Sequence, residues 1–135
     1  MLASSVPLGP FLVDGAGSLA FRHSDTTPGF GFLWRANRCR VRLGGGTLSF
    51  TAVIGRLPST AGGGGQREAA LGVLRAVGKV LPAGWRLRLL ADHRVQVEVE
   101  QALNWPTSMA ALLTPVVRLV FCVAPLMELM REAGM

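Results

Sequence analysis

The segment from Thr107 to Ala133 limits what this chain can fold into, because it is apolar on nearly every side between Met109 and Met127. Its spacing predicts a helix, with Thr107 or Ser108 as the N-cap. A helix on a soluble surface has one apolar stripe and one polar face. This segment has almost no polar face, so we expect both of its sides to be buried: one against its own domain, the other against a second subunit, a binding partner or lipid.

We predict that this helix supports a homodimer, with a dimer or partner surface formed by Leu112, Val116, Leu119, Val120 and Val123. Crossing a membrane is the alternative, since the apolar run is about 28 Å long at 1.5 Å per residue. Arg118, however, lies near its centre, where an arginine costs about 2.5–3.5 kcal/mol on insertion. Pro115 and Pro125 also interrupt it. We therefore do not expect the chain to span a membrane.

Two pairs of segments alternate apolar and polar residues around a turn, which is typical of antiparallel hairpins with one buried face. The first runs over 38–43 and 47–54 with three glycines between them, and the second over 85–89 and 95–99. If Leu89 faces Val95 in the second hairpin, Arg86 lies opposite Glu98. Shorter strands are expected at 11–13, 18–22 and 30–34, and helical spacing at 66–81.

This order predicts an α+β fold: an antiparallel sheet of two or more hairpins, with a middle helix and a long C-terminal helix packed on one side. The 135 residues suit one domain, 1–135, with a flexible N-terminal arm over 1–10 and a Gly-rich loop over 59–65. The N-terminus lacks a basic region followed by a long apolar core, so we expect no secretory signal and a cytoplasmic protein. Cys39 and Cys122 lie in apolar contexts, and we expect both thiols to be buried and unreactive.

The residues that could carry chemistry are few. The glycines before Gln66 lack the Gly-Lys-Ser or Gly-Lys-Thr of a phosphate loop. His23 and His93 are the only histidines, and neither stands among closely spaced metal ligands. His23, Ser24 and Asp25 are the residue types of a hydrolase triad, but triads are assembled from distant parts of a fold. We expect no catalytic site, no metal and no cofactor.

An arginine stripe is the clearest candidate binding feature. Alternation sends Arg38, Arg40 and Arg42 to one face of the sheet and Cys39 to the other, while the whole chain carries a net charge of +6. The stripe could be a solvated outer face, or it could attract an acidic or extended polypeptide, nucleic acid or anionic lipid. No nucleic-acid motif or interleaved aromatic residue accompanies it, so nucleic acid is disfavoured. We predict a polypeptide partner, with Trp34 as an apolar anchor.

From about Arg38 to Glu132 the chain resembles the bacterial type III secretion chaperone-like superfamily, including the YbjN-type sensory domains. The resemblance lies in the strand over 48–54 followed by Gly55-Arg56-Leu57-Pro58, the helix through Leu71, Leu74 and Val77, the hairpin over 85–100 and the long closing helix. It implies a homodimeric, non-enzymatic domain that binds an extended segment of another protein.

We therefore expect a non-enzymatic, chaperone-like protein-binding domain. The alternative is a small-ligand-binding or enzymatic domain, with a pocket between sheet and helices near His23, His93 and Trp34.

Overall fold

The computed structural model describes residues 5–21, 28–60 and 64–135, which form two antiparallel sheets and two helices. This confirms the α+β class. In chain order the elements are β1 (Val6–Leu8), β2 (Phe11–Val13), β3 (Leu19–Phe21), β4 (Gly29–Trp34), β5 (Asn37–Gly44), β6 (Thr47–Arg56), α1 (Gly64–Val80), β7 (Trp85–Leu89), β8 (Arg94–Ala102) and α2 (Met109–Glu132).

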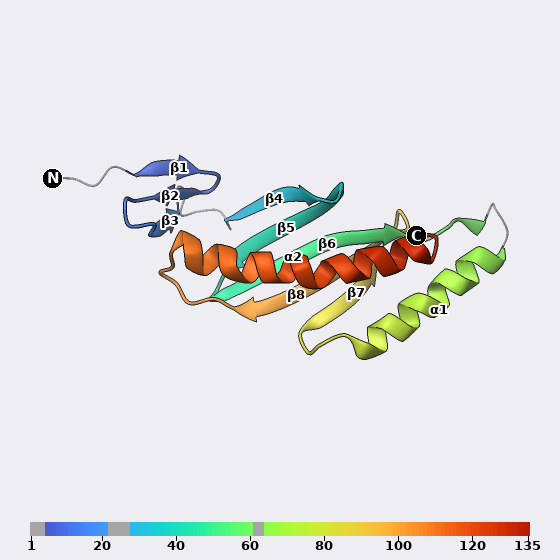
Figure 1. Cartoon of the computed structure of the whole chain (residues 1–135). Coiled ribbons are helices and arrows are strands. Elements are labelled where there is room, and N and C mark those ends of the chain that lie inside the picture. Colours follow the sequence, from blue (N-terminus) through green and yellow to red (C-terminus); the bar gives the residue numbers. More distant parts are fainter. Residues whose placement is uncertain (1–4, 22–27, 61–63) are drawn as a thin grey trace.

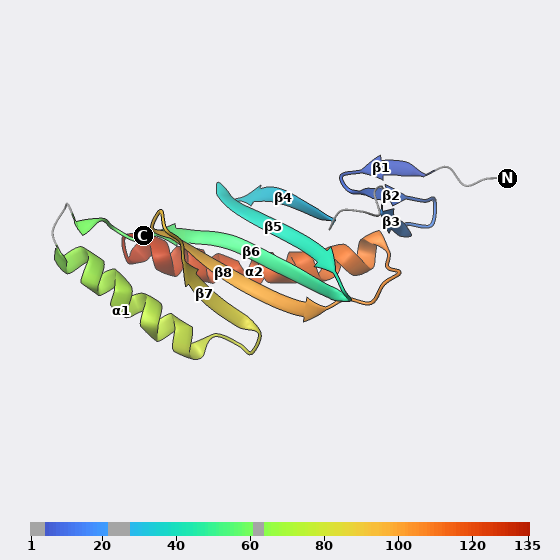
Figure 2. The same cartoon turned by 180° about the vertical axis from the view of Figure 1, so that it is seen from behind.

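The larger sheet has five strands in the order β4-β5-β6-β8-β7. Helix α2 runs across one face of this sheet, and α1 lies along its β7 edge (Figure 1). Seen from behind, the strands lie in front of α2, and neither helix covers their outer face (Figure 2). The sheet therefore has one face that forms the core and one face open to solvent.

The period-two alternation of β5 and β6 produces this division. Their register pairs Val41 with Phe50 and Cys39 with Ala52, so these apolar side chains point to the α2 side. Phe50 and Val41 are completely buried. Because side chains along a strand alternate between the two faces, the arginines between them must point the other way. Both predicted hairpins are present, and Leu89 pairs with Val95 and Arg86 with Glu98 as expected.

Strands β6 and β8 pair along their length, with a register shift between Val53 and Gly55. At Gly55 the C-terminus of α2 comes close to the strand. A Cβ there would lie 3.0 Å from the Cβ of Met130 and 3.2 Å from the Cβ of Met135. Both distances are tighter than ordinary carbon contacts, so the missing side chain at Gly55 lets α2 approach the sheet.

The N-terminal strands form a separate three-stranded sheet, ordered β1-β2-β3. Part of the predicted flexible arm is thus a strand, since Val6–Leu8 pairs with β2. Phe11 and Phe21 pack with Trp105, whose ring stacks on Phe21 at a centroid distance of 4.1 Å. This aromatic contact joins the small sheet to the segment before α2. In the predicted Gly-rich loop, α1 already begins at Gly64, and residues 61–63 lie outside the described residues.

Helix α2 is continuous through Pro115 and Pro125, and Ser108 caps it by accepting a hydrogen bond of 3.1 Å from the Ala111 amide. Within this chain it buries one side, against the sheet, and the expectation that a second subunit, a partner or lipid covers the other side stays a prediction. The buried residues are Leu112, Val116, Leu119, Val120, Val123, Ala124, Met127 and Met130.

The five residues assigned from sequence to a dimer or partner surface are all among these buried residues. They are core residues of this chain, and the surface left for a partner is the opposite side of α2. Cys122 also differs from expectation. Cys39 is buried as predicted, but Cys122 lies on the exposed side of α2.

Candidate functional site

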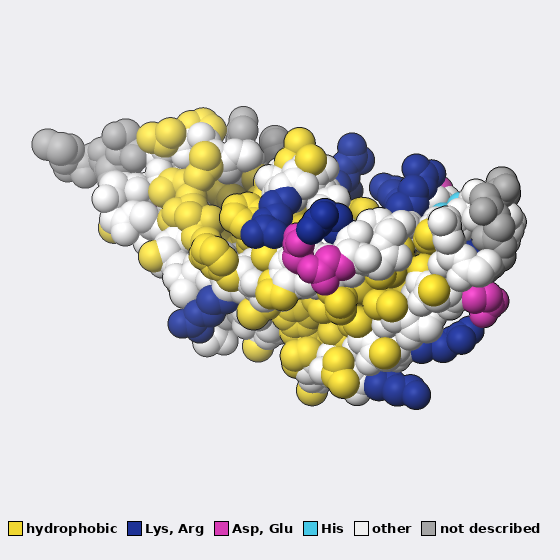
Figure 3. Space-filling view, turned by 45° about the vertical axis from the view of Figure 1, so that its right-hand side comes forward, with side chains coloured by type: hydrophobic (Ala, Val, Ile, Leu, Met, Phe, Trp, Pro, Cys, Tyr) yellow, Lys and Arg dark blue, Asp and Glu magenta, His cyan; other side chains and the backbone are white. Residues whose placement is uncertain are grey.

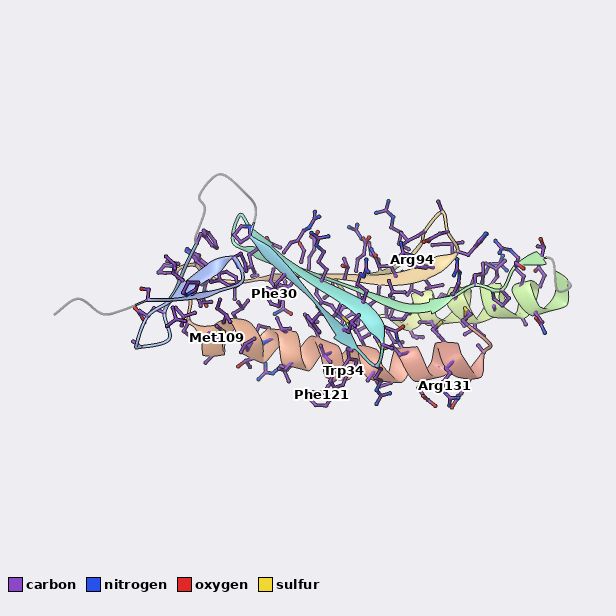
Figure 4. The ribbon with its side chains drawn as sticks, turned by 90° about the horizontal axis from the view of Figure 1, so that it is seen from above. Phe30, Trp34, Arg94, Met109, Phe121 and Arg131 are labelled. Carbon is purple, nitrogen blue, oxygen red and sulfur yellow. The ribbon has the colours of Figure 1, made fainter. Side chains whose placement is uncertain are left out.

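The open face of the five-stranded sheet carries exposed arginines of β5 and β7, and we call the surface formed by Arg38, Arg40, Arg42, Arg86 and Arg88 the arginine face. Arg38, Arg40 and Arg42 project from β5, as the alternation predicts. The register of β7 with β8 puts Arg86 and Arg88 on the same side as Glu98, and the polar residues of β6 lie between the two groups. Figure 4 shows Arg94, at the start of β8, on the side of the sheet away from α2 as well.

Two carboxylates from β8, those of Glu98 and Glu100, lie on this face, and Glu98 forms ion pairs with two of the arginines. The Nε of Arg86 lies 2.8 Å from Oε2 of Glu98, and Nη1 of Arg88 lies 3.4 Å from Oε1. Partial burial alone would raise the pKa of Glu98. Hydrogen bonds from Arg86, Arg88 and Gln96 outweigh that effect, so its pKa is lowered from the ordinary glutamate value.

Arg38, Arg40 and Arg42 form no ion pair with any residue in the described parts of the chain. Glu100, the second carboxylate, pairs in register with Ser49, which pairs with Arg42 on its other side, so Glu100 lies two strands away from Arg42. The β5 half of the face is therefore a row of guanidinium groups that form no ion pair with a described residue. Such groups present planar forks of N–H donors suited to carboxylates.

A hollow of about 420 Å³ lies in the middle of the arginine face. Its lining is polar, with guanidinium donors on both walls and hydroxyl and amide groups on its floor: Arg40, Arg42, Ser49, Thr51, Arg88, Gln96 and Glu98. Strands β4 and β7 are the two edges of the sheet, so each has one side whose backbone groups pair with no further strand of this sheet. The face can thus offer charged side chains, and the edges can offer backbone donors and acceptors.

Trp34 is not part of the arginine face, which corrects its expected place beside the arginines. It pairs in register with Asn37 and lies on the α2 side, with its ring edge-on to Phe121 at a centroid distance of 6.1 Å. Leu33, opposite Arg38 in the ladder, is an apolar residue on the arginine face and is 69% exposed. The sequence could have predicted this difference, because Leu33 and Trp34 are neighbours in one strand and must point to opposite faces of the sheet.

The outer side of α2 is a second unusual surface. Its middle turns expose Leu113, Val117 and Phe121, the last to 64%, and Leu129 follows at 38%. Figure 3 shows hydrophobic side chains gathered in a band across the helix-bearing side of the molecule. By length and composition α2 could also cross a membrane, although a core helix of a soluble protein meets the same criterion.

The histidines do not form a site in the described residues. His93 lies in the turn between β7 and β8 with a positive φ of 69°, and its Nδ1 is 3.4 Å from Nη1 of Arg67. His23, with Ser24 and Asp25, lies outside the described residues. No group of three or more metal-binding side chains occurs among the residues that the structure describes. Neither Trp34 nor His93 is among the residues that line the hollow on the arginine face.

Comparisons with protein-family models, with curated proteins and with solved structures found no match to this chain.

Proposed function

We propose that this chain is a non-enzymatic protein-binding domain that holds an acidic, extended segment of another polypeptide on its arginine face. The observation that carries the proposal is the row of Arg38, Arg40 and Arg42, which form no ion pair with a described residue, on a sheet face that neither helix covers. The chaperone-like resemblance of the sequence agrees with binding of this kind.

The geometry favours an extended ligand. The three β5 arginines stand at every second residue, about 6.5–7 Å apart along the strand. An extended peptide places every second side chain on one side at the same spacing, so alternate carboxylates can meet successive guanidinium groups. Leu33 gives an apolar contact at the end of the row beside Arg38.

The energetics require several contacts together. One exposed ion pair contributes roughly 0–1 kcal/mol, because both ions lose part of their hydration and side-chain freedom. Three such pairs with the apolar contact at Leu33 amount to about 4 kcal/mol, roughly millimolar binding, and only when the segment is held at all of them. Binding should therefore weaken steeply as salt is added.

Nucleic acid fits this face less well. Proteins that hold single strands combine a positive groove with aromatic side chains on which bases stack. The outward residues of β5, β6 and β8 near the hollow are arginine, serine, threonine, glutamine and glutamate, and the aromatic residues of β4 and β6 point to the α2 side.

The test uses a fluorescent peptide with glutamate at every second position and leucine at one end, titrated by fluorescence anisotropy. Arg38→Ser/Arg40→Ser/Arg42→Ser should weaken binding at least tenfold and leave the thermal midpoint nearly unchanged. Two double variants form a matched pair, because each removes two positive charges. Arg40→Ser/Arg42→Ser removes them from the arginine face, and Arg75→Ser/Lys79→Ser removes them from exposed positions of α1. Equal loss in both double variants would show general charge attraction, and unchanged binding in the triple variant would refute the proposal.

A further inference from the structure

The outer side of α2 lacks what a solvated helix face normally has. Within the 24 residues of α2 the charged side chains are Arg118 in the middle and Glu128, Arg131 and Glu132 in the last turns. Between Arg118 and Glu128 the exposed residues are Phe121, Cys122 and Pro125. Phe121 points away from the sheet with Trp34 beside it, which widens the apolar surface toward β4 (Figure 4).

We infer that this surface pairs with the same surface of a second copy, with the two α2 helices antiparallel. In that arrangement Arg118 of each copy lies against Glu132 of the other and beside its Glu128, which is also ion-paired with Arg131 of its own helix. Pairing of identical surfaces about a two-fold axis is the commonest way in which soluble chains assemble.

The charge pattern of α2 supports the antiparallel direction. Residues 118 and 128 lie at equal distances from position 123, so a two-fold axis near Val123 brings each Arg118 opposite a Glu128. The two ion pairs would be about 15 Å apart along the helices at 1.5 Å per residue. The apolar stretch around Phe121 would fill the space between them. A parallel pairing would instead place Arg118 against Arg118, which is unfavourable.

The location of the arginines argues against lipid as the occupant. Basic residues strengthen surface binding to anionic lipid when they lie near the inserted apolar side. Here the arginine face lies on the other side of the sheet, and the one charge in the middle of the apolar stripe is Arg118. A second copy, in contrast, supplies a carboxylate for that charge.

A stable dimer sets the area that the outer side of α2 must bury. A specific interface buries about 800 Å² on each partner. This is roughly a tenth of the 8374 Å² that the chain exposes. A helix of 24 residues is about 36 Å long, and with the Trp34 side of β4 it provides a strip of sufficient length.

The dimer would also affect binding of acidic segments, a consequence that rests on the proposed function. Because α2 and the arginine face lie on opposite sides of the sheet, a dimer through α2 presents two arginine faces that point away from each other. Two acidic segments of one polypeptide, joined by a linker long enough to pass around the dimer, would then bind with higher avidity than either alone.

The first test measures mass by light scattering at tens of micromolar. The wild-type chain should have the mass of two 14.3 kDa chains. Val117→Ser/Phe121→Ser should shift it to one chain, because both residues are exposed and contribute little to the fold of the monomer. The control Leu33→Ser/Val80→Ser removes two residues that are exposed elsewhere, and it should remain dimeric.

The second test uses charge reversal to examine direction and register. Arg118→Glu alone and Glu128→Arg/Glu132→Arg alone should each weaken self-association roughly tenfold or more, since each places like charges together twice. An equimolar mixture of the two should regain dimers, because every facing pair is then opposite in charge. A short bismaleimide should also link Cys122 to Cys122 across the axis.

Three results would overturn the inference. They are a wild-type chain that stays monomeric, a dimer that persists in Val117→Ser/Phe121→Ser, and a charge-reversed mixture that stays as weak as its components. A monomer that binds anionic vesicles and loses that binding in Val117→Ser/Phe121→Ser would identify lipid as the occupant instead. None of these readouts uses the acidic peptide, so they can fail while the proposed function holds.

Discussion

Replacing Glu98 by glutamine should lower the stability of the fold by about 1 kcal/mol near neutral pH. Glu98 is 14% exposed and binds two arginines that are 69% and 65% exposed. Water competes for the arginines, so each contact belongs near the exposed-pair range of about 0–1 kcal/mol rather than the buried range. Glutamine keeps one acceptor for Arg86 but loses the charge. For a chain of this length, about 1 kcal/mol corresponds to roughly 3–5 °C in the thermal midpoint.

The pH dependence has a definite sign. The pKa of Glu98 in the folded protein is lowered from 4.5. Its contribution to stability is therefore fully present above the unfolded-state pKa, and it is lost as pH falls through the folded-state pKa. The difference between the wild type and Glu98→Gln should shrink between about pH 5 and pH 2.

Urea unfolding followed by circular dichroism at several pH values measures this difference. Glu100→Gln is the matched control, because Glu100 lies on the same strand and face and is exposed, with no ion pair to any described residue. It should change stability little at any pH. A Glu98→Gln variant as stable as wild type at neutral pH, or a deficit that persists undiminished at the lowest pH, would refute the reasoning.

Three further outcomes follow from the packing. Phe50→Ala should cost about 3–5 kcal/mol by urea unfolding, because its completely buried ring leaves a cavity over the middle of the sheet. In dilute protein a thiol reagent should modify exposed Cys122 rapidly and Cys39 only on unfolding, since burial both shields the Cys39 thiol and raises its pKa. Comparable modification rates for the two cysteines would contradict this. Ala36→Gly should raise the free energy of unfolding by up to about 1 kcal/mol, and with it the thermal midpoint, because Ala36 has a φ of 63° in the β4–β5 turn, where glycine is favoured. A loss of stability would show that this conformation carries no strain.

Several features could be predicted from the sequence because they depend on neighbouring residues. Alternation along a strand has a period of two, so Arg38 and Cys39 had to lie on opposite faces of whatever sheet they joined. The turn between Leu89 and Val95 set the register that brings Arg86 to Glu98. The order of strands and helices followed in the same way, and with it the α+β class.

Other features were decided by tertiary structure. In α2 nearly every side is apolar, so periodicity could not show which side meets the sheet; packing buried Leu112 and Val123 and left Phe121 and Cys122 exposed. Trp34 went to the α2 side because the pairing of β4 with β5 set its register. The contact of β6 with β8 joins segments about 50 residues apart, which no local pattern encodes. The local sequence thus determined which residues share a face, and long-range packing decided which face each element presents to the core.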